Sequence, residues 1–132
     1  MELRLLITLA IALTFVAALL ATRWWLRRRQ TNLLGVDASE FTTPGHTTVL
    51  YFYTDTCEPC RREQKPELEL LATHTPNVIV RAIDAVAERP IARRFKILSV
   101  PTTMVIGDDG RIRAVNYGVA RRDRLLGQVL AA

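Results

Sequence analysis

The sequence contains two cysteines, Cys57 and Cys60, with Glu58 and Pro59 between them. They stand where a run of β-branched and aromatic residues, 47–54, gives way to a segment that favours a helix. The amide groups and the dipole at a helix start stabilise a thiolate, and an offset of three residues brings two sulfur atoms within disulfide reach. The pattern therefore predicts a redox-active pair in which Cys57 is the exposed nucleophile. Cys60, one turn further along and less exposed, is then expected to resolve the mixed disulfide formed at Cys57.

The cysteine pair has two other interpretations. A C-x-x-C pair is half of a tetrahedral zinc site, but such a site needs two further cysteine or histidine ligands. The chain offers only His46 and His74, which are not spaced as a metal-binding pair. We therefore predict no metal and no cofactor, and the remaining alternative is that the two cysteines are chemically inert.

The hydrophobic pattern around the cysteines predicts an α/β domain. The nearly continuous apolar run before them is typical of a strand buried on both faces of a sheet. The helix after it, expected over 57–74, should be kinked at Pro66. Its leucines should point into the core: Leu68, Leu70 and Leu71. The further elements are expected in the order strand, helix, strand, turn, strand and helix, over 77–83, 87–95, 102–106, 107–110, 111–117 and 121–130. This order implies a mixed sheet sandwiched by helices.

These motifs together resemble the thioredoxin superfamily over residues 41–132. The resemblance includes the strand before the cysteines, C-x-P-C, a proline in the following helix, Ile83-Asp84, the segment from Phe95 to Thr102 with its V-P-T element, and a closing hairpin with Gly118. In that family the proline of V-P-T follows a cis peptide bond and lies against the active-site disulfide. The resemblance therefore implies that Pro101 is cis and that the backbone of Val100 pairs with an incoming polypeptide substrate.

The chain departs from the family's pattern around the cysteines. Thr56 replaces a tryptophan that provides a stacking surface, and Pro66 comes one residue later than the usual helix proline. Tyr51 and Val80 stand where the family has a buried aspartate and its lysine partner, two groups that help to move the proton of the resolving thiol. Tyr51 itself is expected to serve packing. Glu58 is then the nearest titratable side chain, and its charge is expected to disfavour a thiolate by repulsion.

The N-terminus is strongly apolar, with eighteen uncharged residues, 5–22, between two arginines. As a helix they would extend over roughly 27 Å, close to the thickness of the hydrocarbon core of a bilayer. Two tryptophans and three arginines follow, residue types suited to the headgroup layer and the water beyond it. We therefore predict a single-pass transmembrane anchor with a basic flank, 1–29, a connector, 30–46, and a thioredoxin-like domain, 47–132.

A cleaved signal peptide is the alternative to this anchor, but its positive charge would precede the apolar run and a small-residue cleavage site would follow. Here one arginine precedes the run and four follow it, and Ala21-Thr22-Arg23-Trp24 stands in place of a clean cleavage site. The positive-inside rule places the more basic flank, and with it residues 23–132, on the cytoplasmic side of the cell membrane. An extracytoplasmic domain stays open, because a folded domain can be exported past such a flank.

The formal charge of +5 does not indicate nucleic-acid binding once it is divided along the chain. Residues 1–29 hold five arginines and one glutamate, a charge of +4, which leaves +1 for residues 30–132. A protein that binds nucleic acid is expected to carry its basic excess on the folded domain. We therefore expect no nucleic-acid partner.

The sequence thus predicts a membrane-anchored thiol–disulfide oxidoreductase that acts on protein disulfides or dithiols and exchanges electrons with an upstream redox partner. In the reducing direction the Cys57 thiolate attacks a substrate disulfide, and Cys60 then displaces the reduced product. A cytoplasmic domain would favour this direction, because that compartment keeps thiols reduced. Two other functions stay open: a docking module with incidental cysteines, and a metal carrier that binds through the two thiolates.

Overall fold

The computed structural model describes residues 1–132, apart from the side chain of Gln30, and the chain divides into two units, 1–32 and 33–132. The first unit is essentially one helix, α1 (Glu2–Thr31). Its most apolar stretch has a mean hydropathy of 2.5 and is not buried by other parts of the protein. By length and composition α1 could cross a membrane, a test that a signal sequence also passes.

The second unit contains, within the described residues, one sheet of four strands with helices on its faces. Its elements are η1 (Ser39–Phe41), β1 (Thr47–Tyr53), η2 (Cys60–Gln64), α2 (Lys65–His74), β2 (Val78–Asp84), α3 (Arg89–Arg94), β3 (Thr102–Ile106), β4 (Ile112–Tyr117) and α4 (Arg122–Leu130). The strand order is β2-β1-β3-β4, in which β1 and β2 are parallel and the other two pairs are antiparallel. The predicted α/β class, with a mixed sheet flanked by helices, is confirmed.

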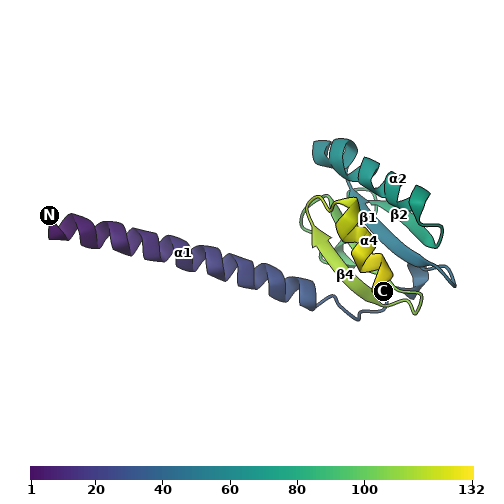
Figure 1. Ribbon diagram of the computed structural model, residues 1–132, viewed down its shortest axis with the longest axis horizontal. Coiled ribbons are helices and arrows are strands. Elements are labelled where there is room, and N and C mark those ends of the chain that lie inside the picture. Colours follow the sequence, from purple (N-terminus) through teal and green to yellow (C-terminus); the bar gives the residue numbers. More distant parts are fainter. The chain divides into compact units, whose positions relative to one another are not determined.

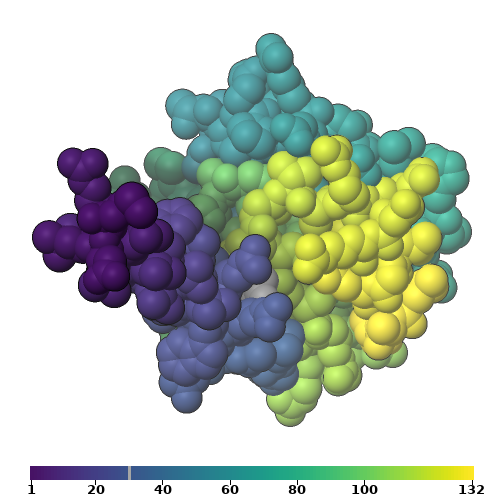
Figure 2. Space-filling model, turned by 60° about the vertical axis from the view of Figure 1, so that its left-hand side comes forward, coloured from purple at the N-terminus to yellow at the C-terminus, as the bar shows by residue number. Residues whose placement is uncertain are grey.

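Strand β1 lies in the middle of the core because its side chains alternate between two apolar clusters. Val49 and Tyr51 face the cluster formed with α2 and α4. Leu50 and Phe52 face the other cluster, where Phe52 packs against Phe95 at the end of α3. Figure 1 shows α2 and α4 on the same side of the sheet, and in Figure 2 the yellow α4 lies against the teal segment that includes α2. A strand buried on both faces explains the nearly continuous apolar run in the sequence.

The segment before β1 packs against the start of β4. The amide of Gly35 donates to the carbonyl of Ile112 at 2.8 Å, and the amide of Ala38 donates to that of Gly110 at 2.8 Å. Gly110 has a φ of +79°, and a Cβ there would lie 2.6 Å from the Cβ of Ser39, so only glycine fits this turn. Through these contacts, most of the predicted connector, 30–46, belongs to the compact unit 33–132.

The helix after the cysteines is widened just before Pro66. In the π-helical turn η2, the amide of Lys65 donates to the carbonyl of Cys60, five residues earlier. Because proline has no amide proton, Pro66 could not extend a regular α-helical ladder, and a π turn accommodates one additional residue. The proline that comes one residue later than usual is thus accommodated by the wider turn. The prediction that Leu70 points into the core is wrong: it lies on the far side of α2 from Leu68 and is 44% exposed.

Candidate active site

The topology of the sheet brings the cysteine motif and the proline loop to the same end. β1 ends at Tyr53 and leads directly to the cysteines, and the amide of Cys57 donates to the carbonyl of Thr54 at 3.1 Å. β3 runs antiparallel to β1, and its first residue, Thr102, pairs with Phe52 near the end of β1. Pro101, directly before Thr102, therefore enters the sheet at the end from which the cysteine motif leaves it.

Cys57 and Cys60 form a disulfide with their Cα atoms 5.3 Å apart. The amide of Cys60 donates to Sγ of Cys57 at 3.2 Å, which is a contact that would stabilise a thiolate on Cys57 in the reduced protein. Cys57 is 8% exposed and Cys60 is 1% exposed. The predicted order of exposure holds, but the prediction of an exposed nucleophile is wrong in degree, because Cys57 is also largely covered in the disulfide form.

The peptide bond between Val100 and Pro101 is cis. Val100 is half-buried and packs against the apolar cluster that contains both cysteines, and Pro101 is buried. The carbonyl of Pro101 accepts a hydrogen bond from the amide of Gly118 at 2.9 Å, which ties the loop to the end of β4. The proline loop is therefore fixed beside the cysteine-containing cluster.

Glu58, between the cysteines, is paired with cations. Its carboxylate forms ion pairs with Arg61 and Arg62, one turn further along. From the sequence, the Glu58 charge was expected to repel a thiolate, but two guanidinium groups compensate that charge. Pro59, with a φ of −59°, fits the first turn of the helix without strain.

Gln64, at the end of η2, supports the site and was not predicted from the sequence. It is completely buried, and its amide group makes two hydrogen bonds with the backbone of Ala120: Nε2 donates to the carbonyl at 3.0 Å, and Oε1 accepts from the amide at 2.8 Å. This pair joins the helix that carries Cys60 to the loop before α4. A glutamine four residues after Cys60, on the same helix face, was the signal that could have revealed it.

We expect Gln64→Met to destabilise the domain strongly. The substitution removes both hydrogen bonds and leaves the two backbone groups of Ala120, which is 1% exposed, without partners. A buried unsatisfied group costs about 1–3 kcal/mol, so the expected loss in the free energy of unfolding is about 2–5 kcal/mol. Urea unfolding of the full chain in detergent, followed by near-ultraviolet circular dichroism, measures it. Glu69→Met, at an exposed position of α2, is the control and should unfold within about 0.5 kcal/mol of wild type. An unchanged midpoint for Gln64→Met would contradict this role.

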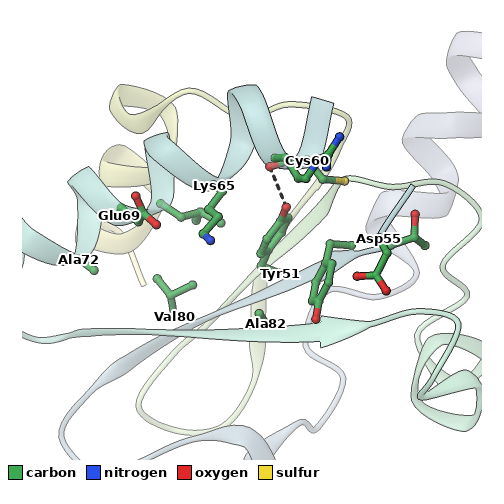
Figure 3. A pocket seen from close by; sticks show the side chains of 12 residues that line it. Tyr51, Asp55, Cys60, Lys65, Glu69, Ala72, Val80 and Ala82 are labelled. Carbon is green, nitrogen blue, oxygen red and sulfur yellow. Dashed lines mark hydrogen bonds between the residues drawn. The ribbon is translucent and has the colours of Figure 1, made fainter. Parts of the chain in front are cut away.

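An open cavity of about 620 Å³ lies beside Cys60, between α2 and the strands β1 and β2 (Figure 3). Its lining is mainly apolar and includes Tyr51, Tyr53 and Val80.

The rings of Tyr51 and Tyr53 stack with their centroids 5.6 Å apart. The hydroxyl of Tyr51 donates to the carbonyl of Cys60 at 3.0 Å, drawn as a dashed line in Figure 3. Burial raises the pKa of Tyr51, and the neighbouring Tyr53 raises it further. Tyr51 is buried as expected, but it also contacts the active-site backbone.

The two histidines lie elsewhere. A ring nitrogen of His46 contacts the carbonyl of Pro44 at 3.1 Å, and one of His74 contacts that of Leu70 at 2.8 Å. Within the part of the chain that the structure describes, no three cysteine, histidine or acidic side chains are grouped so that they could hold a metal ion.

Comparison with known proteins identifies the fold. No curated protein sequence matches this chain. A thioredoxin from Halobacterium salinarum, solved as a point mutant, is 26% identical, with a TM-score of 0.63, over 70% of this chain and 80% of that chain. The oxidised mitochondrial thioredoxin 3 from Saccharomyces cerevisiae is 23% identical, with a TM-score of 0.61, over 72% and 86%. Thioredoxin-2, a component of the malaria parasite protein secretion machinery, is 20% identical, with a TM-score of 0.63, over 69% and 87%. The thioredoxin family model matches residues 38–131, which is most of the chain and includes both cysteines and Pro101, and the protein therefore belongs to the thioredoxin family.

Proposed function

We propose that the protein is a membrane-anchored thiol–disulfide oxidoreductase that acts on protein disulfides and dithiols through Cys57 and Cys60. The observation that carries this proposal is the disulfide between these two residues at the start of a helix, in a thioredoxin fold. The fold and the close cysteine pair fit thiol–disulfide exchange in general. The protein substrate and the membrane location are the specific parts of the proposal.

The proposed reduction has two exchange steps. In the dithiol form, the Cys57 thiolate attacks one sulfur of a substrate disulfide; that bond breaks, a mixed disulfide forms, and the other substrate sulfur leaves and takes up a proton. The Cys60 thiolate then attacks Sγ of Cys57, which forms the Cys57–Cys60 disulfide and releases the second substrate sulfur as a thiolate. Two electrons pass to the substrate. A dithiol of an upstream partner then supplies two electrons that reduce the Cys57–Cys60 disulfide again. The amide of Cys60, which donates to Sγ of Cys57, supports Cys57 as attacking and leaving thiolate.

A polypeptide substrate is proposed to pair with the backbone of Val100. Val100 directly precedes a cis proline and packs on the cluster that contains the cysteines, at the end of the sheet where β1 leads to the active site. An extended segment that pairs with backbone at this position would bring its own cysteine towards Cys57. Main-chain pairing of this kind favours extended protein segments over small disulfides.

The proposed anchor is α1, and the proposed location of the domain is the cytoplasmic face of the cell membrane. The apolar stretch of α1 and the four arginines after it support the anchor and its orientation. Trp24 and Trp25 stack on Arg28 and Arg29, with the guanidinium carbons 4.5 and 4.9 Å from the ring centroids, at the end of α1 suited to the interface. In the cytoplasm, reduction is the expected direction. An extracytoplasmic domain is the alternative that a C-terminal reporter fusion distinguishes.

The activity is tested on the full chain in detergent, with dithiothreitol as electron donor and a protein disulfide as substrate. We expect catalysed reduction well above the rate with dithiothreitol alone. The matched control is the same protein reduced and then alkylated at both cysteines, which should show only the uncatalysed rate. Equal rates for the free and the alkylated protein would contradict the proposal and favour a docking module. One equivalent of copper or zinc in the native mass spectrum would favour a metal carrier.

A further inference from the structure

We propose that Tyr51 is a positioning residue for the resolving cysteine: its hydroxyl holds the backbone of Cys60 so that Sγ of Cys60 stays within reach of Sγ of Cys57. The inference rests on the proposed function and adds a residue that acts on the second exchange step. It starts from the hydrogen bond between the Tyr51 hydroxyl and the Cys60 carbonyl, 3.0 Å long and buried from solvent.

Cys60 stands at an irregular point of its helix. It is the first residue of the π turn η2, and the partner of its carbonyl along the helix is the amide of Lys65, five residues away. π turns are rare, occur mostly as single turns and are frequent at functional sites, so the helix is irregular at Cys60. The Tyr51 hydroxyl is a second donor to the same carbonyl, from outside the helix, and it therefore restrains the backbone of Cys60 at this irregular turn.

Tyr51 is suited to provide this restraint. It is 6% exposed and belongs to β1, which is paired on both sides, by β2 and β3. Its ring is also held by the stacked ring of Tyr53, with an angle of 29° between the ring planes. The hydroxyl is thus presented to the backbone of the resolving cysteine from a strand that is paired on both sides.

The role is positioning and not proton transfer. The Tyr51 hydroxyl already donates its proton to a carbonyl, and burial raises its pKa, so it stays protonated and cannot accept the proton of the Cys60 thiol. The charged side chains that border the cavity are Asp55, Arg61, Lys65 and Glu69. A neutral phenol keeps its hydrogen bond whatever the charge on these groups, which makes the restraint independent of pH in the physiological range.

The restraint has a measurable consequence for the closing of the disulfide. Two thiols held close together form their disulfide with a higher equilibrium constant, because less conformational freedom is lost when the ring closes. Without the Tyr51 hydroxyl, the reduced Cys60 samples more conformations, and closure becomes less favourable. A single hydrogen bond corresponds to a factor of roughly 3 to 10 in an equilibrium constant. A tenfold factor shifts the potential of a two-electron couple by about 30 mV.

The test compares wild type, Tyr51→Phe and Tyr53→Phe as full chains in detergent, equilibrated with glutathione buffers of known composition. Tyr53→Phe is the matched control, because it removes a hydroxyl from the same strand and the same cavity but keeps the hydrogen bond to Cys60. For Tyr51→Phe we expect the equilibrium constant of disulfide formation to fall about 3- to 10-fold, which raises the potential by about 15–30 mV. We also expect more of the mixed disulfide between Cys57 and glutathione. Tyr53→Phe should match wild type in both measurements.

A merely structural role for Tyr51 would lower the urea midpoint of unfolding and leave the glutathione equilibrium unchanged, and that result overturns the inference. Wild type that forms no disulfide in any of the buffers would instead overturn the proposed function, so the two failures are distinguishable. If Tyr51→Phe does not fold, as judged by circular dichroism, the same measurements are made on Tyr51→Met, which also lacks the hydroxyl. A wild-type equilibrium in that variant would equally contradict the inference.

Discussion

Replacing Cys60 by serine is expected to change the protein from a catalyst into a trap for its substrates. Cys57 keeps its place at the start of the helix and still attacks a substrate disulfide, but no second sulfur is present to displace the product. Because intramolecular attack by a well-placed thiol far exceeds attack by millimolar external thiols, we expect turnover to fall by at least about 100-fold. Mixed disulfides should accumulate, and non-reducing electrophoresis of membranes that contain Cys60→Ser detects them as bands that dithiothreitol removes.

Cys57→Ser is the matched control for the trap. It keeps one thiol, on Cys60, but that residue is 1% exposed against 8% for Cys57. We therefore expect Cys57→Ser to lose turnover as well, without accumulating mixed disulfides. Trapping by Cys57→Ser in place of Cys60→Ser would reverse the roles assigned to the two cysteines. Mass spectrometry of the trapped bands would identify the substrate proteins, and the compartment of those proteins would indicate on which side of the membrane the domain lies.

The fold was predictable because its signals are local. The run 47–54 is almost entirely β-branched and aromatic, and a run of this kind is typical of a central strand covered on both faces. The strand 102–106 was predicted at its observed bounds. The predictions for β1 and β4 differ by one residue at one end, and the prediction for β2 is shifted by one residue at both ends. β1 and the cysteine motif are adjacent in sequence, so the strand-to-helix junction at Cys57 could be predicted from the chain alone. The family resemblance implied that the V-P-T element lies beside the cysteines. The pairing of Thr102 with Phe52, near the end of β1, agrees with this position.

The parts of the site that were not predicted depend on contacts between distant residues. Gln64 and Ala120 are 56 residues apart, and nothing in the sequence near Gln64 indicates which backbone groups its amide will meet. The Tyr51 hydroxyl and the Cys60 carbonyl are only nine residues apart, but their contact depends on how η2 packs on β1, and local sequence patterns do not reveal that packing. Tyrosine in a strand most often serves packing, so its residue type alone favoured the simpler interpretation.

Two errors have local physical reasons. Leu70 was expected in the core with Leu68, but residues two apart on a helix lie on nearly opposite sides, so both could not face the sheet. The exposure of Cys57 was inferred from its place at a helix start, and that inference ignored the apolar cluster into which the disulfide packs. The ion pairs of Glu58 could have been predicted, because Arg61 and Arg62 follow it at the helical spacings of three and four residues.

The proposed membrane anchor can be tested by placing charges in the apolar stretch of α1. Two arginines introduced in the apolar stretch of α1, by Leu9→Arg together with Leu13→Arg, should move the protein from the membrane fraction into the soluble fraction. Each arginine at the centre of a span costs about 3 kcal/mol, so the pair is expected to lower the insertion equilibrium by a factor of about 10,000. Both leucines are exposed and lie in the first unit, so the thioredoxin domain is unchanged.

Wild type should stay in the membrane pellet through alkaline carbonate washing and enter solution only with detergent, because an apolar span is held by the hydrocarbon and not by charge. Leu9→Lys with Leu13→Lys, the same charges on a shorter head group, should behave like the arginine pair. The intact mass of the wild-type protein distinguishes the anchor from a signal peptide. A membrane-bound chain that retains Glu2 supports the anchor. A chain that lacks residues 1–21 and is recovered outside the membrane contradicts the anchor. Such a chain would place the dithiol in an oxidising compartment, where disulfide formation, and not reduction, is the favoured direction.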